Sequence, residues 1–293
     1  MESSQAADTL PKGQTSPSAV RVAIARAVHQ LLDEPVVFND PWALSILGKP
    51  LEQAVRDDPF QFNDPAARTM RAAVVARNRL AEDTLQSSVS RGIKQYVVLG
   101  AGLDTFSLRN PYQANGLLVF EVDQPTMQEQ KLKTLQDTMI AVPAASRFVS
   151  VDFESDSLED RLRQAGFSTD EPTCFSWLGV TAYLTNAAVL ETLSFVARLP
   201  KGSSITFDYR IPATLLGPVE RMMEELGSAM FAAMNEPWIS SFDPAALRKQ
   251  LIEMGFAHFE AYGPAELNAR YFPKRKDGLQ TGGGGFRLLC AHV

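Results

Sequence analysis

The chain has 293 residues, 45% of them hydrophobic, so it can bury a large core in one domain or in a domain with an appendage. Its net charge of −6 argues against nucleic acid as the main partner, because neutralising phosphates requires a basic surface. A mean hydropathy of −0.10, with no run of 18 apolar residues and no export signal, predicts a cytoplasmic protein that does not bind membranes. The three histidines lack the spacing of metal ligands, so we expect no metal.

The N-terminal third is predicted to be helical. Residues 1–17 are polar and lack periodicity, which indicates a disordered lead. Apolar residues spaced by three and four then predict a helix over 18–31. The segment "FNDPWALSIL" predicts a short second helix with Asp40 as its N-cap, and a third helix is expected over 65–89. Residues 18–90 therefore form a predicted helical cap.

Strands and helices alternate through the rest of the chain, residues 91–293. The predicted strands are "QYVVLGA", "LLVFEVD", "RFVSVDF", "TCFSWLGV", "SSITFDYR", "FAHFEAY" and "FRLLCAHV". Strands that are apolar on both faces indicate a parallel sheet covered by helices on both sides, and the last two strands suit an antiparallel pair. This pattern predicts an α/β core.

One methionine-rich segment, about 213–240, does not fit the alternation. Methionine is an adaptable apolar side chain. The segment is either a helix packed on the sheet or a lid that lines a pocket for an apolar substrate.

A glycine-rich turn follows the first strand in "YVVLGAGLDTF", where Gly100, Ala101 and Gly102 leave the backbone bare. In open α/β sheets ligands bind beyond the carboxyl ends of the strands. The turn lacks the third glycine of the dinucleotide fingerprint. Asp104 would also repel a pyrophosphate but would tolerate a cationic amino group. The turn therefore favours an aminoacyl ligand over a dinucleotide.

Acidic residues end the next two strands. Asp123 follows Gly100 by 23 positions, the place of an acidic residue that receives ribose hydroxyls. NAD and S-adenosylmethionine both carry such a ribose. After the third strand, Asp152 and Phe153 could bind an adenine amino group and pack on its ring, although Asp152 could equally cap the following helix.

Arg77 lies inside the apolar stripe of the third predicted helix, between Val74 and Leu80. A guanidinium that faces a core requires an anion, because an unpaired buried charge is very costly. Its partner is either a protein carboxylate, such as Glu121 or Asp104, or the carboxylate of a ligand.

The pocket for the substrate is expected beyond the fourth and fifth strands, next to Tyr183 and Tyr209. Each tyrosine could shape the pocket or take part in proton transfer. His29 lies in the first helix, where a structural role is the better interpretation. We therefore name no catalytic base.

Several of these stretches together resemble one family. The set "VVLGAGLDTFSLR", "VFEVDQP", "RFVSVDF", "WLGVTAYLT", "ITFDY" and "ARNRLAED" resembles the leucine carboxyl methyltransferase family, in particular its bacterial S-adenosylmethionine-dependent O-methyltransferases. The resemblance runs from about Ser18 to the C-terminus. It implies the class I methyltransferase fold, a Rossmann-like α/β fold with a seven-stranded sheet, helices on both faces and helical additions over the active site.

The same resemblance implies roles for individual residues. Arg77 would bind the methionine carboxylate, Gly100 to Gly102 would approach the aminoacyl part, Asp123 would bind the ribose, and Asp152 with Phe153 would hold adenine. One position departs from the family pattern, because Leu178 stands where many relatives have a glutamate before the following glycine. Leu178 would thus line a more apolar cofactor and acceptor site, and a substrate shared with those relatives is in doubt.

These observations favour an enzyme that uses S-adenosylmethionine to methylate a carboxylate or hydroxyl oxygen of a small, apolar molecule. An NAD(P)-dependent oxidoreductase and a catalytically silent cofactor-binding protein are the alternatives. The first predicts nicotinamide binding, and the second predicts cofactor binding without turnover.

Overall fold

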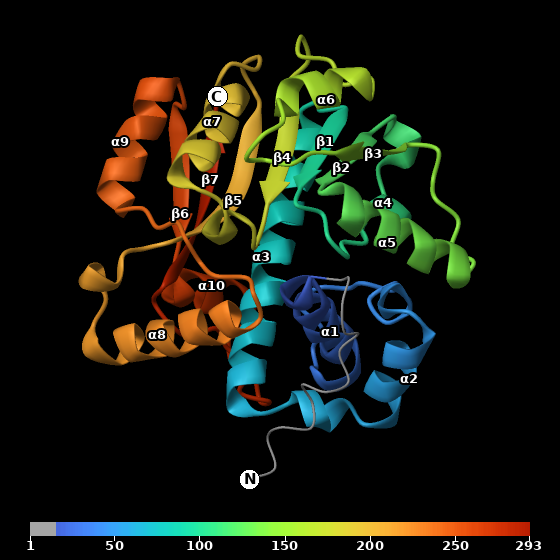
Figure 1. Cartoon of the computed structure of the whole chain (residues 1–293), viewed down its shortest axis with the longest axis vertical. Coiled ribbons are helices and arrows are strands. Elements are labelled where there is room, and N and C mark those ends of the chain that lie inside the picture. The colour runs from blue at the N-terminus through green and yellow to red at the C-terminus, as the bar shows by residue number, and fades with distance from the viewer. Residues whose placement is uncertain (1–15) are drawn as a thin grey trace.

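A seven-stranded sheet forms the centre of the protein in a computed structural model that describes residues 16–293 (Figure 1). Its strand order is β3-β2-β1-β4-β5-β7-β6, with β1 to β5 parallel and β7 antiparallel to both β5 and β6. The strands are β1 (Gln95–Leu99), β2 (Leu118–Asp123), β3 (Ser146–Ser150), β4 (Thr173–Trp177), β5 (Ser204–Arg210), β6 (His258–Tyr262) and β7 (Phe286–His292). The predicted seven-stranded α/β sheet with an antiparallel end is confirmed.

Both faces of the sheet are covered by helices, as its uninterrupted apolar strands predict. Val97 and Leu99 of β1 belong to a core cluster that also contains side chains of α6, α7 and α9. Tyr96 and Val98 point to the opposite face, where they pack in a cluster with α3 and α4. The helices after β1 are α4 (Phe106–Arg109), α5 (Pro125–Asp137), α6 (Leu158–Gln164), α7 (Asn186–Ala197), α8 (Pro218–Ala233), α9 (Pro244–Met254) and α10 (Pro264–Tyr271).

Three helices precede the sheet: α1 (Pro17–Leu32), α2 (Lys49–Asp57) and α3 (Pro65–Ser90). The predictions for α1 and α3 are confirmed to within one residue at most ends. The short helix predicted after Asp40 is wrong. Asp40 does accept a hydrogen bond from the backbone N–H of Trp42, but the chain forms only a turn and a 3-10 segment, Ser45–Leu47. Gly48, with φ 78°, ends that segment, and α2 begins directly after it.

The N-terminal helices and α8 gather at one edge of the sheet, the edge to which the parallel strands point (Figure 1). α3 continues from this edge along the sheet, and its Leu85 packs in the same cluster as β1. α3 thus joins the core, and a division into a cap over 18–90 and a core over 91–293 stays a proposal. Residues 1–15 of the predicted lead lie outside the described residues.

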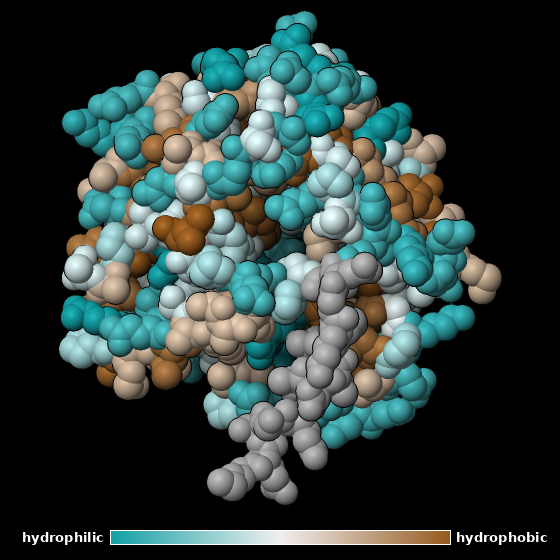
Figure 2. Space-filling model, viewed as in Figure 1, coloured by the Kyte–Doolittle hydropathy of each residue, from teal (hydrophilic) through white to brown (hydrophobic). Residues whose placement is uncertain are grey.

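Over residues 16–293 we find no helix with both the length and the apolar character that crossing a membrane requires. The face in Figure 2 is mostly hydrophilic, with hydrophobic side chains in separate patches.

Candidate cofactor and acceptor site

A cavity of about 1080 Å³ lies at the carboxyl edge of the parallel strands, where an open α/β sheet binds its ligands. Its walls come from α1, α3, α8, the turns after β1, β2, β3 and β4, and a strip of four glycines before β7. The predicted residues that line it are Arg77, Gly100, Ala101, Gly102, Asp123, Asp152, Phe153, Leu178 and Tyr183. Residues separated by more than 100 positions in the sequence are therefore brought together as expected.

The glycine turn after β1 requires its glycines. Gly100 and Gly102 have φ of 63° and 49°, in the left-handed region that side chains disfavour. A Cβ added at Gly100 would lie 2.2 Å from Cγ2 of Val180, so no side chain fits there. The turn accordingly presents bare backbone to the cavity.

Asp123 lies beside that turn at the end of β2. Its carboxylate accepts hydrogen bonds from the backbone N–H groups of Gly102, at 2.5 Å, and Gln124, at 2.7 Å. Burial raises the pKa of Asp123, and these two N–H donors counteract the rise only in part. The carboxylate is thus fixed in orientation at the place predicted for a ribose.

Asp152 and Phe153 follow β3 and border the same cavity. The Asp152 carboxylate accepts from the backbone N–H of Glu154 at 3.0 Å, whereas the N-cap of α6 is Ser157. Asp152 is therefore not the cap of α6, which was the alternative interpretation. The Phe153 ring lies 5.8 Å from that of Trp177, centroid to centroid.

Arg77 points from α3 into the cavity and pairs with a carboxylate that the sequence did not indicate. Its Nη1 lies 2.8 Å from Oδ2 of Asp208, whose Oδ1 accepts a hydrogen bond from the backbone N–H of Gly179 at 2.7 Å. The two protein partners suggested from the sequence, Glu121 and Asp104, are wrong. Nε of Arg77 is buried and has no hydrogen-bond partner among the described residues.

The carboxylates suggested for Arg77 are held by other cations. Glu121 is fully buried and pairs with Lys131, with Nζ and Oε2 2.5 Å apart. Asp104 lies 3.7 Å from Nη1 of Arg26, and its Oδ1 accepts from the backbone N–H of Phe106. Neither carboxylate is left for Arg77.

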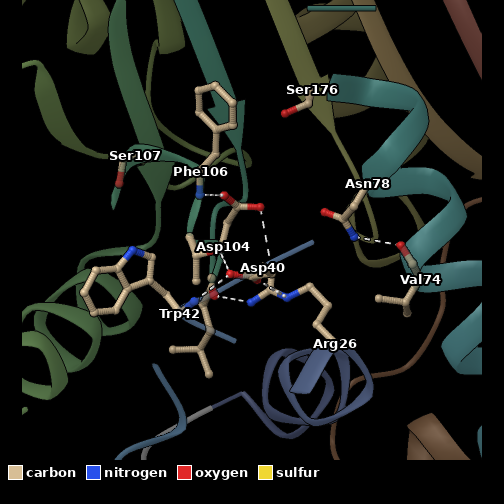
Figure 3. Close-up of polar contacts among 12 residues, drawn as sticks. Arg26, Asp40, Trp42, Val74, Asn78, Asp104, Phe106, Ser107 and Ser176 are labelled. Carbon is tan, nitrogen blue, oxygen red and sulfur yellow. Dashed lines mark hydrogen bonds and ion pairs between the residues drawn. The ribbon is translucent and has the colours of Figure 1, made fainter. Parts of the chain in front are cut away.

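Arg26 ties α1 to the glycine turn (Figure 3). Its Nη2 donates to the carbonyl of Leu103 at 2.5 Å, and its Nε lies 3.5 Å from the Asp40 carboxylate, which accepts from Oγ1 of Thr105. The network is buried and holds the turn from the side opposite the sheet. Sequence reasoning missed Arg26, although a cation within the apolar periodicity of the first helix could have indicated it.

In β5, "SITFDYR", successive side chains point to opposite faces of the sheet. This alternation explains why Asp208 reaches the cavity and why the prediction for Tyr209 fails. Asp208 faces the cavity, and Tyr209 points to the opposite face of the sheet. Tyr209 is buried, its ring lies 5.9 Å from that of Phe207, and it does not line the cavity, so the prediction for Tyr209 is wrong. β5 runs to Arg210, as the segment "SSITFDYR" predicted, so Tyr209 lies within the strand and not beyond it. A carboxylate on a buried strand was the available signal for Asp208.

Tyr183 lies at the cavity between Arg77 and α8. Burial is the largest cause that raises the pKa of its hydroxyl, and side-chain hydrogen bonds with Ser18 and Trp238 oppose the rise. A raised pKa keeps the hydroxyl protonated near neutral pH, so it can donate a hydrogen bond but not act as a base. His29 is fully buried and bonds Asp33 at 2.7 Å, which confirms its structural role.

The methionine-rich segment forms a wall of the cavity. α8 carries Met223 and Met230 on this wall, and it packs on the glycine strip, not on the faces of the sheet. A Cβ added at Gly284 or Gly285 would lie within 2.2 Å of a glutamate oxygen of α8. Of the two interpretations, the structure matches the pocket wall.

The fold that carries this cavity is the class I methyltransferase fold, as solved structures show. A crystal structure of a methyltransferase from Thermobifida fusca YX aligns with a TM-score of 0.53 at 18% identity, covering 92% of this chain and 94% of that one. A DUF574 family protein from Streptomyces avermitilis MA-4680 aligns with a TM-score of 0.50 at 17% identity, covering 92% and 96%.

Sequence comparison identifies the family. The family model of leucine carboxyl methyltransferase matches residues 19–197. YktD of Bacillus subtilis (strain 168), which carries the name of an S-adenosyl-L-methionine-dependent methyltransferase, is 32% identical, covering 92% of this chain and 95% of YktD. The chain belongs to the leucine carboxyl methyltransferase family, and it is an S-adenosylmethionine-dependent methyltransferase. This finding decides against the dehydrogenase alternative.

The cavity fits S-adenosylmethionine, which is a cation overall. Nine carboxylates line it, against two guanidiniums, within residues 16–293. The bare turn at Gly100 leaves room for the ligand, and Arg77 has an unpartnered Nε beside the cavity.

Proposed function

We propose that the protein is an O-methyltransferase that transfers the methyl group of S-adenosylmethionine to a carboxylate or hydroxyl oxygen of a small, apolar molecule. The observation that carries this proposal is the convergence of Arg77, the glycine turn and Asp123 on one cavity, beside an apolar wall from α8. Family membership favours oxygen as the acceptor atom, since the family is named for carboxyl methylation.

Each residue at the strand ends has a proposed task. Arg77 binds the carboxylate of the cofactor's methionine part, because a guanidinium matches a carboxylate with two parallel hydrogen bonds. Asp123 receives the ribose hydroxyls, and Asp152 with Phe153 holds the adenine. Leu178 supplies apolar contact where many relatives have a glutamate.

The bound cofactor supplies an electrophilic methyl group on a sulfonium that is an excellent leaving group. The protein contributes position and the exclusion of water, which together can lower such a barrier by several kcal/mol, about 7–11 in the best-oriented cases. Arg77 and Asp123 would hold the two ends of the aminoacyl-ribose unit, and Leu178 lines the same cavity with an apolar side chain. No histidine among residues 16–293 lines the cavity, and we assign no general base.

Calorimetric titration with S-adenosylhomocysteine tests the proposal, with NADH as a control ligand. For Arg77→Ala we expect the affinity to fall about tenfold to a hundredfold, as for a lost charge-assisted hydrogen bond. Arg79→Ala is the matched control, because Arg79 lies two positions away on α3 and pairs with Asp83 outside the cavity. Thermal melts establish that each variant is folded.

Two results would contradict the assignment. One is the failure of the wild-type protein to bind S-adenosylhomocysteine. The other is an equal loss of affinity in Arg77→Ala and Arg79→Ala.

A further inference from the structure

The end of the cavity beyond Arg77 differs in chemistry from the strand ends. Its walls are aromatic, apolar or bare backbone: Met223, Met230, Phe231, Trp238, Phe286 and the glycine strip. Phe231 and Trp238 stack with centroids 4.8 Å apart, and Phe286 meets Trp238 edge-on at 5.2 Å. Such walls suit a flat ring, because aromatic rings pair in stacked and edge-to-face arrangements.

The charged side chains that line this end of the cavity are carboxylates, and no uncommitted cationic side chain of the described residues lines it. Glu220, Glu224 and Glu236 line it. Glu224 is neutralised by Arg210, whose guanidinium also lies 4.7 Å from the ring of Trp238. Glu220 and Glu236 form no ion pair in the described part of the chain. Glu220 accepts from the backbone N–H of Gly217, and Glu236 accepts from Ser16 and Ser18 at the start of α1.

The two guanidiniums that line the cavity within residues 16–293 are already engaged. Arg77 is bound to Asp208, and under the proposed function it also holds the cofactor's carboxylate. Arg26 is bound between Asp40 and Asp104. An acceptor carboxylate that entered this end would face unpaired glutamates with no partner from the protein, which is an unfavourable way to bury a charge.

We propose that this end is the acceptor subsite and that it takes an uncharged, ring-bearing molecule that presents a hydroxyl oxygen, not a carboxylate. This inference rests on the proposed function and narrows it to hydroxyl methylation. The acceptor oxygen forms the new bond to the methyl carbon while the carbon–sulfur bond breaks. The electron pair of the broken bond stays on sulfur. The hydroxyl proton leaves to solvent at the cavity mouth, where Met223 is 53% exposed. Phenols suit this route because, with a pKa of about 10, they lose their proton far more readily than aliphatic alcohols.

The test uses the full-length protein saturated with S-adenosylhomocysteine and three ligands of one skeleton. These are 4-phenylphenol, 4-phenylbenzoate and protonated 4-phenylbenzylamine, which present a hydroxyl, an anion and a cation. We expect 4-phenylphenol to bind at least about tenfold more tightly than 4-phenylbenzoate, a difference of about 1.4 kcal/mol. In turnover with labelled cofactor, label is expected on the phenol and not on the benzoate.

A pair of neighbouring methionines provides a matched control. Met223 lines the cavity and Met222 does not, yet both are 53% exposed on α8. Met223→Arg supplies the missing cation, so we expect it to improve benzoate binding relative to the phenol by about tenfold, whereas Met222→Arg leaves the ratio unchanged.

The proposal is overturned if the benzoate or the amine binds as tightly as the phenol, or if no member of the set binds. It is also overturned if Met222→Arg and Met223→Arg shift the ratio equally. Binding of S-adenosylhomocysteine is measured first, so a failure of the cofactor assignment is distinguished from a failure of the acceptor assignment.

Discussion

At Gly100 both the backbone conformation and the access of a ligand to the cavity depend on the absence of a side chain. We expect Gly100→Ala to lower the affinity for S-adenosylhomocysteine more than tenfold and to destabilise the fold by about 1–3 kcal/mol, because the new Cβ would lie 2.2 Å from Val180 at a positive φ. Calorimetry and urea denaturation measure the two effects.

The variant Gly116→Ala separates the effect of backbone strain from the effect of the steric clash with Val180 in Gly100→Ala. Gly116 also has a positive φ, of 80°, but nothing lies within 4 Å of its added Cβ. We expect this variant to lose about 1–2 kcal/mol of stability and to keep its ligand affinity. Wild-type affinity in Gly100→Ala would contradict the role given to the turn.

The need of a single residue for a partner could be predicted where the neighbouring sequence determined its environment. Arg77 could be singled out because a guanidinium inside an apolar stripe requires an anion. Its partner, Asp208, lies 131 positions away, and the two meet because α3 packs against β5. Tyr209 was misplaced because it was expected just beyond the fifth strand, whereas it lies within β5, where neighbouring side chains point to opposite faces.

At the level of elements, strong periodicity gave accurate bounds and weak periodicity did not. α1 and α3 were predicted to within one residue, since apolar residues recur along them at helical spacing. α2 was missed because only Leu51 and Val55 of its nine residues are buried, which is too little for a helical pattern. α10 is eight residues long and gave a similarly weak signal.

The loop between α10 and β7 contains an ion pair and is joined to the N-terminal part of the chain by hydrogen bonds, from Arg275 to Pro35 and from Arg68 of α3 to Asp277. Arg275, with 3% of its side chain exposed, binds the Asp277 carboxylate through Nε at 2.8 Å and also donates to the carbonyl of Pro35. Hydrogen bonding from Arg275 is the largest cause that lowers the pKa of Asp277, from 3.8 to about 2. The loop continues into the glycine strip that lines the cavity.

This depressed pKa predicts a pH dependence of stability. A carboxylate whose folded pKa lies below its unfolded value stabilises the fold above about pH 4, and the contribution is lost as the pH falls toward about 2. We expect Asp277→Asn to be less stable than the wild type at about pH 6, and the difference between their free energies of unfolding in urea to narrow toward about pH 3.

Asp57→Asn is the control. Asp57 accepts a hydrogen bond from the side chain of Gln53 and forms no ion pair among the described residues. Its difference from the wild type should not change with pH. A constant difference for Asp277→Asn over the same range would show that the ion pair does not fix the loop.

For the whole molecule, composition predicted the class of partner but not the location of the charge. A net charge of −6 argued against nucleic acid as the main partner, yet it could not show that nine carboxylates border one cavity among the described residues. That concentration results from the fold, because the ends of four parallel strands and three helices meet at one edge. It favours a cationic cofactor and an uncharged acceptor in the same cavity.

A crystal structure of the protein with S-adenosylhomocysteine tests the central claim most directly. We predict the amino-acid carboxylate on the Arg77 guanidinium, the ribose hydroxyls on Asp123, and the adenine beside Asp152 and Phe153, with the apolar end at α8 left open. A ligand bound elsewhere, or one whose carboxylate does not contact Arg77, would contradict the account.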